Sequence, residues 1–350
     1  MVSRDAFLTA LTRQQKLSIE EMIEFWRQVD HGEQSPQKVL AVLSALSSRP
    51  LEVDIAVAFL RYLQLAYPKT ALRTAQNAVN IVGTGGGIST FNISTTSAFV
   101  VAAAGVRVLK SGSRAYSSQT GSQDVLERLG IRVTVNDDIL EEMLQTLGIG
   151  FAPIARYPAL CRKLVTLCQP LPFSLVGQVI NRLGPLLCPF ELKGQVIGVS
   201  DPSLLQTLAC TAREMGLDNL LFTHSQTGAD EMLPFGGNSC WWVRFQGDLQ
   251  WSEVANTVGS PPRKGDITRL KGGNAAENAQ RLQRVLAGKD CDEAQEAVAL
   301  NAGAALWVAG RVNSLQEGSS LAKEILRSGL GGEVLQRTQR FCRQLREVVV

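Results

Sequence analysis

The sequence contains very little histidine and no paired cysteine motif, which limits the chemistry it can perform. It has two histidines, His31 and His224, and seven scattered cysteines, none of them in a Cys-x-x-Cys pair. These features argue against a histidine-based catalytic triad, a multi-histidine metal centre, a zinc site and a disulfide framework. Any metal binding must therefore rest on carboxylates. Scattered cysteines in odd number indicate reduced thiols, so we expect a cytoplasmic protein.

Long apolar segments and a strong excess of charge are also missing. No apolar run approaches the roughly 20 residues that a bilayer span requires. Residues 1–18 are polar and charged and lack the apolar core of a signal peptide. The 35 basic and 32 acidic residues leave a formal net charge of +3. This balance indicates neither a membrane nor a nucleic-acid partner.

The chain does have enough apolar material for a large core, since 45% of its 350 residues are hydrophobic. Its first part reads as helices alone. Ser18 and Glu21 have the spacing of a capping box, and Ser35 followed by Pro36 marks another helix start. We therefore predict a helical domain over residues 1–68, joined by helices from about residues 157–190.

From residue 74 to residue 350 the pattern changes to short buried strands that alternate with helices. Such alternation predicts an α/β domain with a mainly parallel central sheet covered by helices. Residues 239–254 are typical of an antiparallel ribbon, in which we expect Trp241 and Trp242 to pack in the core. The predicted strands are residues 78–82, 106–109, 131–135, 149–154, 195–200 and 219–224.

A glycine-rich loop, "GTGGG" at residues 83–87, directly follows the first predicted strand. Ligands of α/β sheets sit beyond the carboxyl ends of the strands, where glycines expose main-chain N–H groups to an anion. Asn92, Ser94 and Thr95 then supply neutral donors at the start of the next helix. A tight turn followed by a helix cap explains the same residues equally well.

Two further segments follow strands at the same predicted edge. Residues 110–130 begin with Lys110 and contain many serines and glycines, as suits a ligand with several phosphates. The strand at 219–224 leads to the adjacent carboxylates Asp230 and Glu231. Mg²⁺ prefers one or two carboxylates together with substrate phosphates, although adjacent carboxylates often lie unused on a surface. His224 is expected to be a structural hydrogen-bonding residue.

Ordered motifs along nearly the whole chain resemble the anthranilate phosphoribosyltransferases, whose fold group includes the pyrimidine nucleoside phosphorylases. These motifs are "GTGG", "TFNIST", "KxGxRAxSSxxGSxDVLExLG", "LGPLL", "GADE", "LKGGNAAENA" and "NAGAALWVAG". The resemblance implies transfer of 5-phosphoribose from phosphoribosyl pyrophosphate to anthranilate or a related small aromatic acceptor, with Mg²⁺ required and pyrophosphate released. It also implies a homodimer and makes residues 74–350 the donor-binding domain.

The resemblance further implies roles for single residues. Ser94, Asp230 and Glu231 should bind magnesium, and Lys110 with the two carboxylates should stabilise charge, without a general base. Gly83, Ser113 and Gly177 correspond to positions that face the acceptor. The donor-binding residues should be Gly83, Gly85, Gly86, Gly87, Thr90, Asn92, Ile93, Ser94, Thr95, Lys110, Ser117, Ser118 and Ser122.

Departures from the family pattern are concentrated where the acceptor should bind. Gly87 replaces the aspartate of the family's GTGGD loop, which is about one residue shorter here. Ser111 and Ser113 replace the histidine and asparagine of KHGNR, and Gln119 replaces a lysine. The arginine that holds the anthranilate carboxylate corresponds to Gly177. Loss of one charge-assisted contact lowers the binding free energy by roughly 1.5–3 kcal/mol. The acceptor could therefore be a molecule other than anthranilate.

The sequence leaves open whether another arginine replaces the missing one, and it leaves two alternative functions. Arg156 or Arg182 could replace the missing cation, but the sequence does not place either in the pocket. A nucleoside phosphorylase-like enzyme is one alternative, although the Asp-Glu pair suits pyrophosphate and magnesium better. The other is a non-catalytic ligand- or nucleic-acid-binding paralogue. It rests on a basic stripe near the C-terminus, formed by Arg337, Arg340, Arg343 and Arg346.

Overall fold

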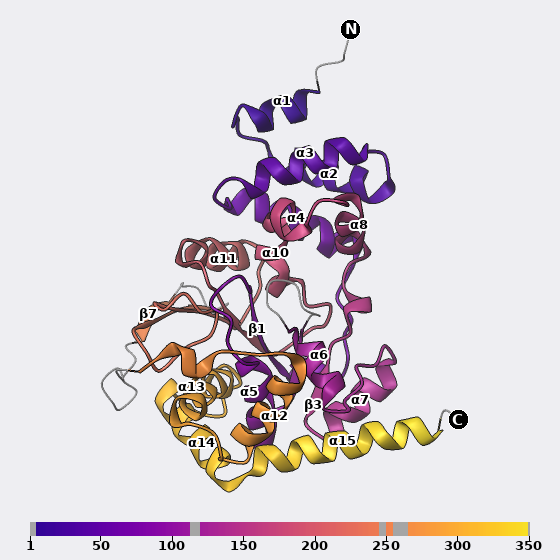
Figure 1. Ribbon diagram of the computed structural model, residues 1–350. Helices are drawn as coiled ribbons and strands as arrows, with labels where there is room; N and C mark the ends of the chain where they lie inside the picture. The colour runs from indigo at the N-terminus through magenta and orange to yellow at the C-terminus, as the bar shows by residue number, and fades with distance from the viewer. Residues whose placement is uncertain (1–4, 113–119, 245–249, 255–264, 349–350) are drawn as a thin grey trace.

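A computed structural model describes residues 5–112, 120–244, 250–254 and 265–348. It has a helical part and an α/β part, which lie at opposite ends of the molecule in Figure 1. The N-terminal helices are α1 (Ala6–Thr12), α2 (Ile19–His31), α3 (Pro36–Ser47) and α4 (Val53–Ala66). None of the described helices is both long and apolar enough to cross a membrane.

The helix starts of the N-terminal part follow the local sequence signals. The Ser18 hydroxyl accepts a hydrogen bond from the Glu21 amide at 3.1 Å, and the Glu21 carboxylate accepts one from the Ser18 amide at 2.8 Å. Ser35 caps α3, with Pro36 at its first position. Inside the bundle, Trp26 packs edge-on against Phe59 with ring centroids 5.0 Å apart. The predicted capping box is confirmed.

A second segment of the chain packs onto these helices. It comprises α8 (Ala159–Leu167), α9 (Phe173–Val176) and α10 (Gln178–Leu183). The buried Ser47 hydroxyl of α3 donates to the Val176 carbonyl at 2.9 Å and accepts from the Val179 amide at 3.1 Å. Lys163 of α8 donates to the Asp30 carbonyl of α2 at 2.8 Å. These bonds fix the orientation of α8 to α10.

The described strands form one seven-stranded sheet in the order β3-β2-β1-β4-β5-β6-β7. The first five in this order are parallel neighbours, and β6 and β7 extend the sheet as an antiparallel ribbon. The predicted α/β class and mainly parallel sheet are confirmed. The strands are β1 (Val79–Gly83), β2 (Val108–Lys110), β3 (Ile149–Phe151), β4 (Gly194–Gly198), β5 (Leu220–Ser225), β6 (Asn238–Val243) and β7 (Gln250–Val254).

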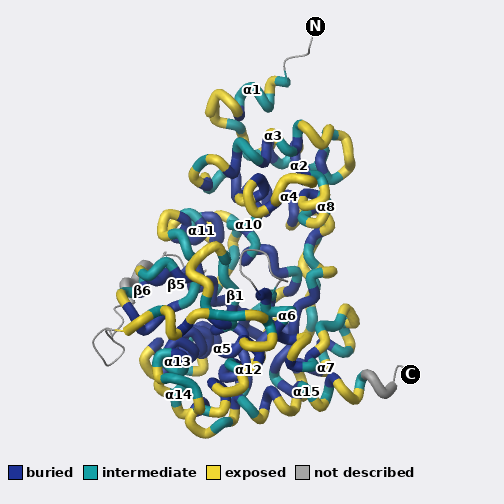
Figure 2. Tube along the Cα trace, viewed as in Figure 1, coloured by how far each residue is buried: buried dark blue, intermediate teal, exposed yellow. Residues whose placement is uncertain are grey.

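Helices cover both faces of the sheet. In Figure 1, α11 (Pro202–Glu214) lies on the side of the helical part, while α5 (Ile93–Ala103) and α13 (Asp292–Val308) lie on the opposite side. Figure 2 shows long buried stretches in this lower layer. The remaining helices are α6 (Ser122–Arg128), α7 (Asp137–Thr146), α12 (Ala275–Leu286), α14 (Leu315–Ser328) and α15 (Leu330–Val348). The 3₁₀ turns are η1 (Ala75–Asn77), η2 (Ile154–Arg156), η3 (Gly184–Leu187) and η4 (Ile267–Leu270).

One predicted strand is wrong. Residues 131–135 form no strand and connect α6 to α7. Ile131 is fully buried, whereas the Val135 side chain is 60% exposed. The apolar residues of this segment therefore do not line a common sheet face. The neighbour position beside β2 is taken by β3, which follows α7 in the chain.

Candidate active site

A cleft of about 450 Å³ separates the carboxyl ends of β1 and β2 from the helical part. This size falls within the range of roughly 300–1,000 Å³ that is usual for ligand sites. We call one side the strand end; it is formed by residues 82–92, 94, 110–112, 120–122, 230 and 231. The other side, the helical end, is formed by Ile154, Tyr157, Cys161, Arg162, Val165, Phe173, Ile180, Asn181, Gly184, Pro185 and Leu187.

The glycine loop at the strand end makes room for another part of the same chain. A Cβ atom on Gly83 would lie 2.2 Å from Asp230 Oδ2, and one on Gly87 would lie 2.5 Å from the Gly228 carbonyl oxygen. The Gly85 amide donates a hydrogen bond of 2.7 Å to Asp230 Oδ2. Two of the loop glycines are therefore needed for close packing against residues 228–231. Gly85 and Gly86 also have positive φ angles of 67° and 80°, which favour glycine.

Asp230 and Glu231 lie together at the strand end and are partly buried. Burial raises the pKa of Asp230, although the hydrogen bond from the Gly85 amide acts against this. Burial and the charge of Asp230 raise the pKa of Glu231 well above its ordinary value. Thr90 Oγ1 donates to both Glu231 oxygens, at 3.2 and 3.1 Å. Two carboxylates held close in this way favour the arrival of a cation.

Lys110 places a positive charge beside these carboxylates. Its side chain is only 4% exposed, and its ammonium donates to the Ser111 carbonyl at 2.6 Å. Burial lowers the pKa of Lys110 to about 8, while the charges of Glu231 and Asp230 act in the opposite direction. A cation that has given up most of its hydration is available to bind an anionic group at the strand end.

Some of the first residues of α5 line the cleft, and others are buried in the core. Ser94 lines the cleft, and Asn92 lines it while accepting a hydrogen bond of 3.0 Å from the Asn278 amide group. The side chains of Ile93 and Thr95 are fully buried and do not line the cleft. The prediction that these two residues contact the donor can therefore apply only to their main-chain groups.

Ser94, Asp230 and Glu231 also share a small hollow of about 20 Å³ behind the glycine loop. These are the three residues that the sequence assigns to magnesium. Within the described ranges, no group of three or more histidine, cysteine, aspartate or glutamate side chains is arranged to hold a metal ion. Two carboxylates and a hydroxyl that also line the larger cleft nevertheless suit Mg²⁺, which keeps several waters and takes substrate phosphates as ligands.

Ser111, at the position of the family's histidine, belongs to a buried polar network. Its amide donates to Asn80 Oδ1 at 2.9 Å, and its hydroxyl accepts from Asn80 Nδ2 at 3.0 Å and donates to Cys188 Sγ at 3.6 Å. Asn80 Nδ2 also donates to Gln195 at 3.0 Å. The serine hydroxyl is therefore oriented by protein groups at the edge of the cleft.

Of the other predicted site residues, one lines the cleft and three lie outside the described part of the chain. Ser122 lines the cleft, where its hydroxyl lies 1.9 Å from the position that a Cβ on Gly112 would take. Ser113, Ser117 and Ser118 lie outside the described residues.

Gly177 does not line the cleft, because the Phe173 ring lies against it. A Cβ on Gly177 would lie 2.2 Å from that ring. The structure therefore gives no support to direct contact between Gly177 and an acceptor.

Residues that sequence reasoning missed come mainly from the helical end. Arg162 and Val165 face the cleft from α8, and Tyr157, Phe173 and Ile180 complete its apolar wall. Helical periodicity could have shown that α8 has two faces. It could not have shown which of them meets the ligand, because that depends on the distant contacts of Ser47 and Lys163.

Of the sequence expectations outside the cleft, those for His224 and Trp242 agree with the geometry, whereas Trp241, also expected in the core, is only half-buried. His224 is buried, and its Nδ1 lies 2.8 Å from the Val199 carbonyl oxygen, as a structural hydrogen bond requires. Trp242 is buried and packs edge-on against Trp307, with ring centroids 4.3 Å apart. Both residues stabilise the α/β part.

Comparison with known proteins places these features in a family. Residues 75–331 match the family described as "Glycosyl transferase family, a/b domain". The chain is 36% identical over 341 residues to the anthranilate phosphoribosyltransferase of Thermomicrobium roseum, covering 96% of each chain. It is 35% identical over 327 residues to that of Deinococcus radiodurans, covering 92% of this chain and 94% of the relative.

Solved structures give the same answer. The anthranilate phosphoribosyltransferase of Thermus thermophilus has a TM-score of 0.82 and 32% identity, covering 96% of this chain and 99% of that one. The Saccharomyces cerevisiae enzyme in complex with PRPP and Mg shares the fold, with a TM-score of 0.77 at 21% identity, covering 97% of this chain and 99% of that one. The chain belongs to the anthranilate phosphoribosyltransferase family of glycosyltransferases.

Proposed function

We propose that this protein transfers 5-phosphoribose from phosphoribosyl pyrophosphate to anthranilate or a related small aromatic acceptor, releasing pyrophosphate. The observation that carries the proposal is the hollow shared by Ser94, Asp230 and Glu231, beside the glycine loop and Lys110. One small region thus combines metal-binding oxygens, main-chain donors and a buried cation. This is the set of groups that a magnesium–pyrophosphate donor requires.

The strand end would bind the donor and stabilise its leaving group. Amides of the glycine loop and the first turn of α5 would donate to phosphate oxygens, and Lys110 would offset the charge that develops on pyrophosphate. Ser122, opposite the loop, would hold a further phosphate oxygen. When bound by Ser94, Asp230 and Glu231, Mg²⁺ neutralises phosphate charge. In this scheme residues 74–350 form the donor-binding domain, and residues 1–68 with 157–190 form the helical domain.

The helical end would position the acceptor. Tyr157, Phe173 and Ile180 offer an apolar wall on which a flat ring can lie with its amine directed toward the strand end. Attack of this amine on the anomeric carbon requires chiefly positioning and stabilisation of the departing pyrophosphate. No histidine is among the described residues that line the cleft, which accords with a reaction without a histidine base.

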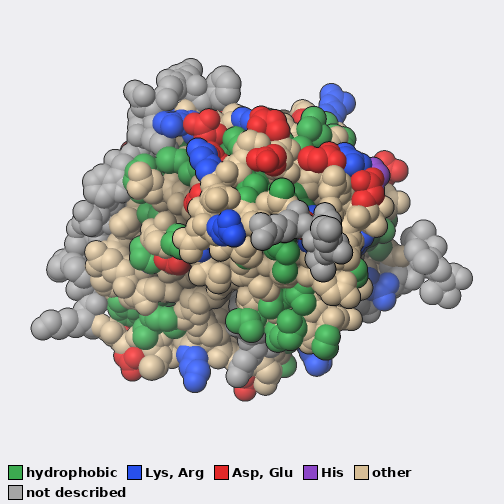
Figure 3. Space-filling model, turned by 90° about the horizontal axis from the view of Figure 1, so that it is seen from above, with side chains coloured by type: hydrophobic (Ala, Val, Ile, Leu, Met, Phe, Trp, Pro, Cys, Tyr) green, Lys and Arg blue, Asp and Glu red, His purple; other side chains and the backbone are tan. Residues whose placement is uncertain are grey.

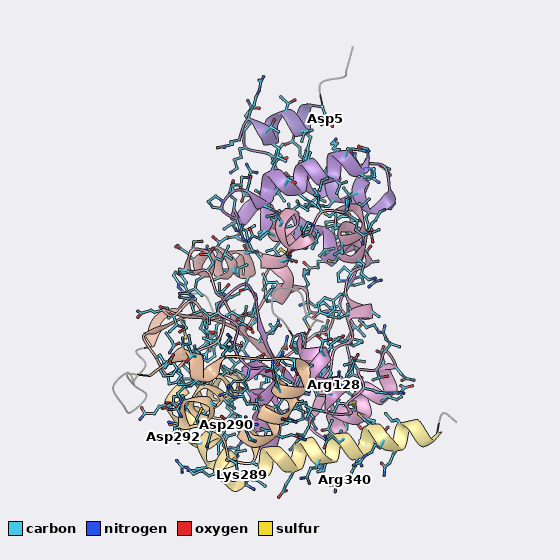
Figure 4. The ribbon with its side chains drawn as sticks, viewed as in Figure 1. Asp5, Arg128, Lys289, Asp290, Asp292 and Arg340 are labelled. Atoms are coloured by element: carbon cyan, nitrogen blue, oxygen red, sulfur yellow. The ribbon has the colours of Figure 1, made fainter. Side chains whose placement is uncertain are left out.

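The experiment is a pyrophosphate-release assay with phosphoribosyl pyrophosphate, Mg²⁺ and anthranilate, beside a panel of substituted benzoates, anilines and nucleobases. Replacing Asp230 with Asn and Glu231 with Gln should abolish both release and Mg²⁺-dependent donor binding. The control replaces an exposed carboxylate at the start of α13, Asp292→Asn. Asp292 lies far from the strand ends in Figure 4, so this control should keep full activity.

Two results would contradict the proposal. Unchanged Mg²⁺-dependent donor binding in the Asp230 and Glu231 double variant would remove the assignment of these carboxylates. Phosphate-dependent cleavage of a nucleoside, without use of phosphoribosyl pyrophosphate, would favour a nucleoside phosphorylase instead. Release with an acceptor other than anthranilate would keep the reaction class and name the specificity.

The active form would be a cytoplasmic homodimer that meets through its helical parts. Figure 3, which looks onto the helical end of the molecule, shows apolar side chains exposed in patches between charged ones. Such patches are available to a second copy of the chain. Light scattering after size-exclusion chromatography should give about twice the chain mass of 37.9 kDa. A monomer mass at assay concentration would contradict this part.

A further inference from the structure

Helix α8 forms one wall of the cleft and carries cations on two different faces. Cys161, Arg162 and Val165 line the cleft, whereas Leu160 and Leu164 are fully buried in the helical part. Lys163, next to Arg162 in sequence, turns away and donates to the Asp30 carbonyl of α2 at 2.8 Å. The positive charge that α8 presents to the cleft therefore comes from Arg162.

Among the described residues that line the cleft, the lysines and arginines are Lys110 and Arg162. Lys110 lies at the strand end, where its charge interacts with Asp230 and Glu231. Arg162 lies on α8 at the helical end, where its neighbours in the cleft wall include Tyr157 and Val165. The two cations thus serve opposite ends of the cleft.

The Arg162 guanidinium is held in place by the main chain. Its Nη1 donates to the carbonyl oxygens of Ala155 and Tyr157, at 3.2 and 3.1 Å. A guanidinium has five N–H donors in a planar fork, so anchoring through Nη1 leaves the Nε and Nη2 edge to bind a carboxylate. Because these two main-chain carbonyls already hold the guanidinium, the Arg162 side chain loses little conformational entropy when a ligand binds.

The other candidate arginines are engaged elsewhere. Arg156 forms an ion pair with Asp137 and does not line the cleft. Arg182 donates to the Arg49 carbonyl at 3.3 Å and to Gln178 at 3.1 Å, and it does not line the cleft either. Neither residue supplies the cation that is missing at Gly177.

We infer that Arg162 determines acceptor specificity by binding the carboxylate of an aromatic amino acid acceptor. The inference rests on the proposed function. The acceptor ring lies on the apolar wall, its amine faces the strand end, and its carboxylate points away from Asp230 and Glu231 toward Arg162. This orientation keeps the acceptor's negative charge apart from the two carboxylates and beside Arg162, the cation that the described residues place at the helical end.

The test compares an acceptor that carries the charge with an analogue that lacks it. For the full-length enzyme with Mg²⁺, we would measure the KM for anthranilate, the KM for phosphoribosyl pyrophosphate and the inhibition constant of 2-aminobenzamide. Arg162→Gln should raise the KM for anthranilate about ten- to a hundredfold, the usual size of one charge-assisted contact. The donor KM and the 2-aminobenzamide constant should stay unchanged, and Arg162→Lys should give an intermediate value.

Arg182→Gln is the matched control, because it removes the same side chain from a position outside the cleft. It should leave all three constants unchanged. The inference is overturned if Arg162→Gln leaves the anthranilate KM unchanged, or if it weakens anthranilate and 2-aminobenzamide equally. Release of pyrophosphate by the wild type with uncharged acceptors alone would overturn the inference and keep the proposed reaction class, whereas no release with any acceptor of the panel would overturn the proposed function.

Discussion

The strand end of the cleft is made largely of main chain and short side chains, whereas the helical end is made largely of long apolar side chains. At the strand end, Gly83 and Gly198 lie against Asp230 so closely that neither position admits a Cβ without movement. At the helical end, a Cβ on Gly177 would meet the Phe173 ring, a side chain of the cleft wall and not main chain. The difference implies that donor geometry is fixed by the sheet, while acceptor preference changes with single side chains.

The largest effect should come from filling the space beside the carboxylates. A Cβ on Gly198 would lie 1.5 Å from the Asp230 carbonyl oxygen, so Gly198→Ala must displace residues 228–231. Displacement of catalytic groups by about 1 Å can cost ~10²-fold in rate. We expect loss of most activity, a higher donor KM and a lower melting temperature, measured by pyrophosphate release and by calorimetry.

Gly177→Ala is the corresponding change at the helical end. Its Cβ would lie 2.2 Å from the Phe173 ring, which lines the cleft and would have to move. We expect a raised acceptor KM and an unchanged donor KM. If Gly198→Ala instead keeps its activity, or Gly177→Ala alters the donor KM, the contrast between the two ends is wrong.

A smaller effect should follow from the charge on Lys110. Because burial lowers its pKa to about 8, the free enzyme loses this charge as the pH rises through that value. The KM for phosphoribosyl pyrophosphate should therefore rise several-fold over the next pH unit, while the acceptor KM should not. Lys110→Met should raise the donor KM about ten- to a hundredfold at neutral pH.

The informative comparison is the pH profile of this variant. Without an ionisable group at position 110, the donor KM of Lys110→Met should no longer rise above pH 8. An equally steep rise in the variant would show that another group titrates there. Measurement at saturating Mg²⁺ keeps metal binding out of the comparison.

Removal of the charge on Asp230 and Glu231 is expected to stabilise the fold. Since folding raises the pKa of both Asp230 and Glu231, their charged forms oppose folding. Their favourable contribution is fully present below their ordinary pKa values and is lost as the pH rises through the raised ones. In the absence of Mg²⁺ at neutral pH, Asp230→Asn with Glu231→Gln should raise the melting temperature by a few degrees.

This gain should shrink at lower pH, where protonation removes the same charges from the wild type. Asp292→Asn serves again as the control and should give no such pH-dependent gain. An inactive variant that melts lower than the wild type at neutral pH would contradict the expected electrostatic cost. The comparison separates what the strand end contributes to function from what it contributes to stability.

The strand end was predictable from sequence because its parts follow neighbouring parallel strands. Lys110 ends one such strand and Asp230 follows another, and parallel strands bring their carboxyl ends to one edge. The reason for the glycines was only partly predictable. Residues 83–87 indicated a close approach, but a sequence does not say whether a ligand or residues 228–231 of the chain itself is approached.

The helical end could not be predicted, because its geometry depends on contacts between distant segments. Whether Arg156, Arg162 or Arg182 faces the cleft is decided by how α8 to α10 lie on α2 and α3. That orientation depends on bonds such as Ser47 to Val176, across 129 residues of sequence. Local patterns predict the helices but not their rotation, so they could not show that Gly177 lies against Phe173 and outside the residues that line the cleft.

The smallest effect on activity and stability is expected from substitutions on α15, a surface that belongs to neither end of the cleft. The basic residues of α15 lie at the far end of the molecule from the helical part, where Figure 4 labels Arg340. Arg337, Arg340 and Arg343 are exposed, while Leu335, Thr338 and Cys342 on the same helix are buried; the side chain of Arg346 lies outside the described residues. This alternation is that of an ordinary amphipathic helix with a solvated charged face.

Replacing Arg340 and Arg343 with Gln should therefore leave both KM values unchanged and alter the free energy of unfolding by no more than about 0.5 kcal/mol. The wild-type protein should give no gel shift with DNA or RNA at low salt. A shift that weakens steeply with added salt, and that the double variant loses, would establish phosphate contacts on α15. Only that result would assign this surface a binding role separate from the cleft.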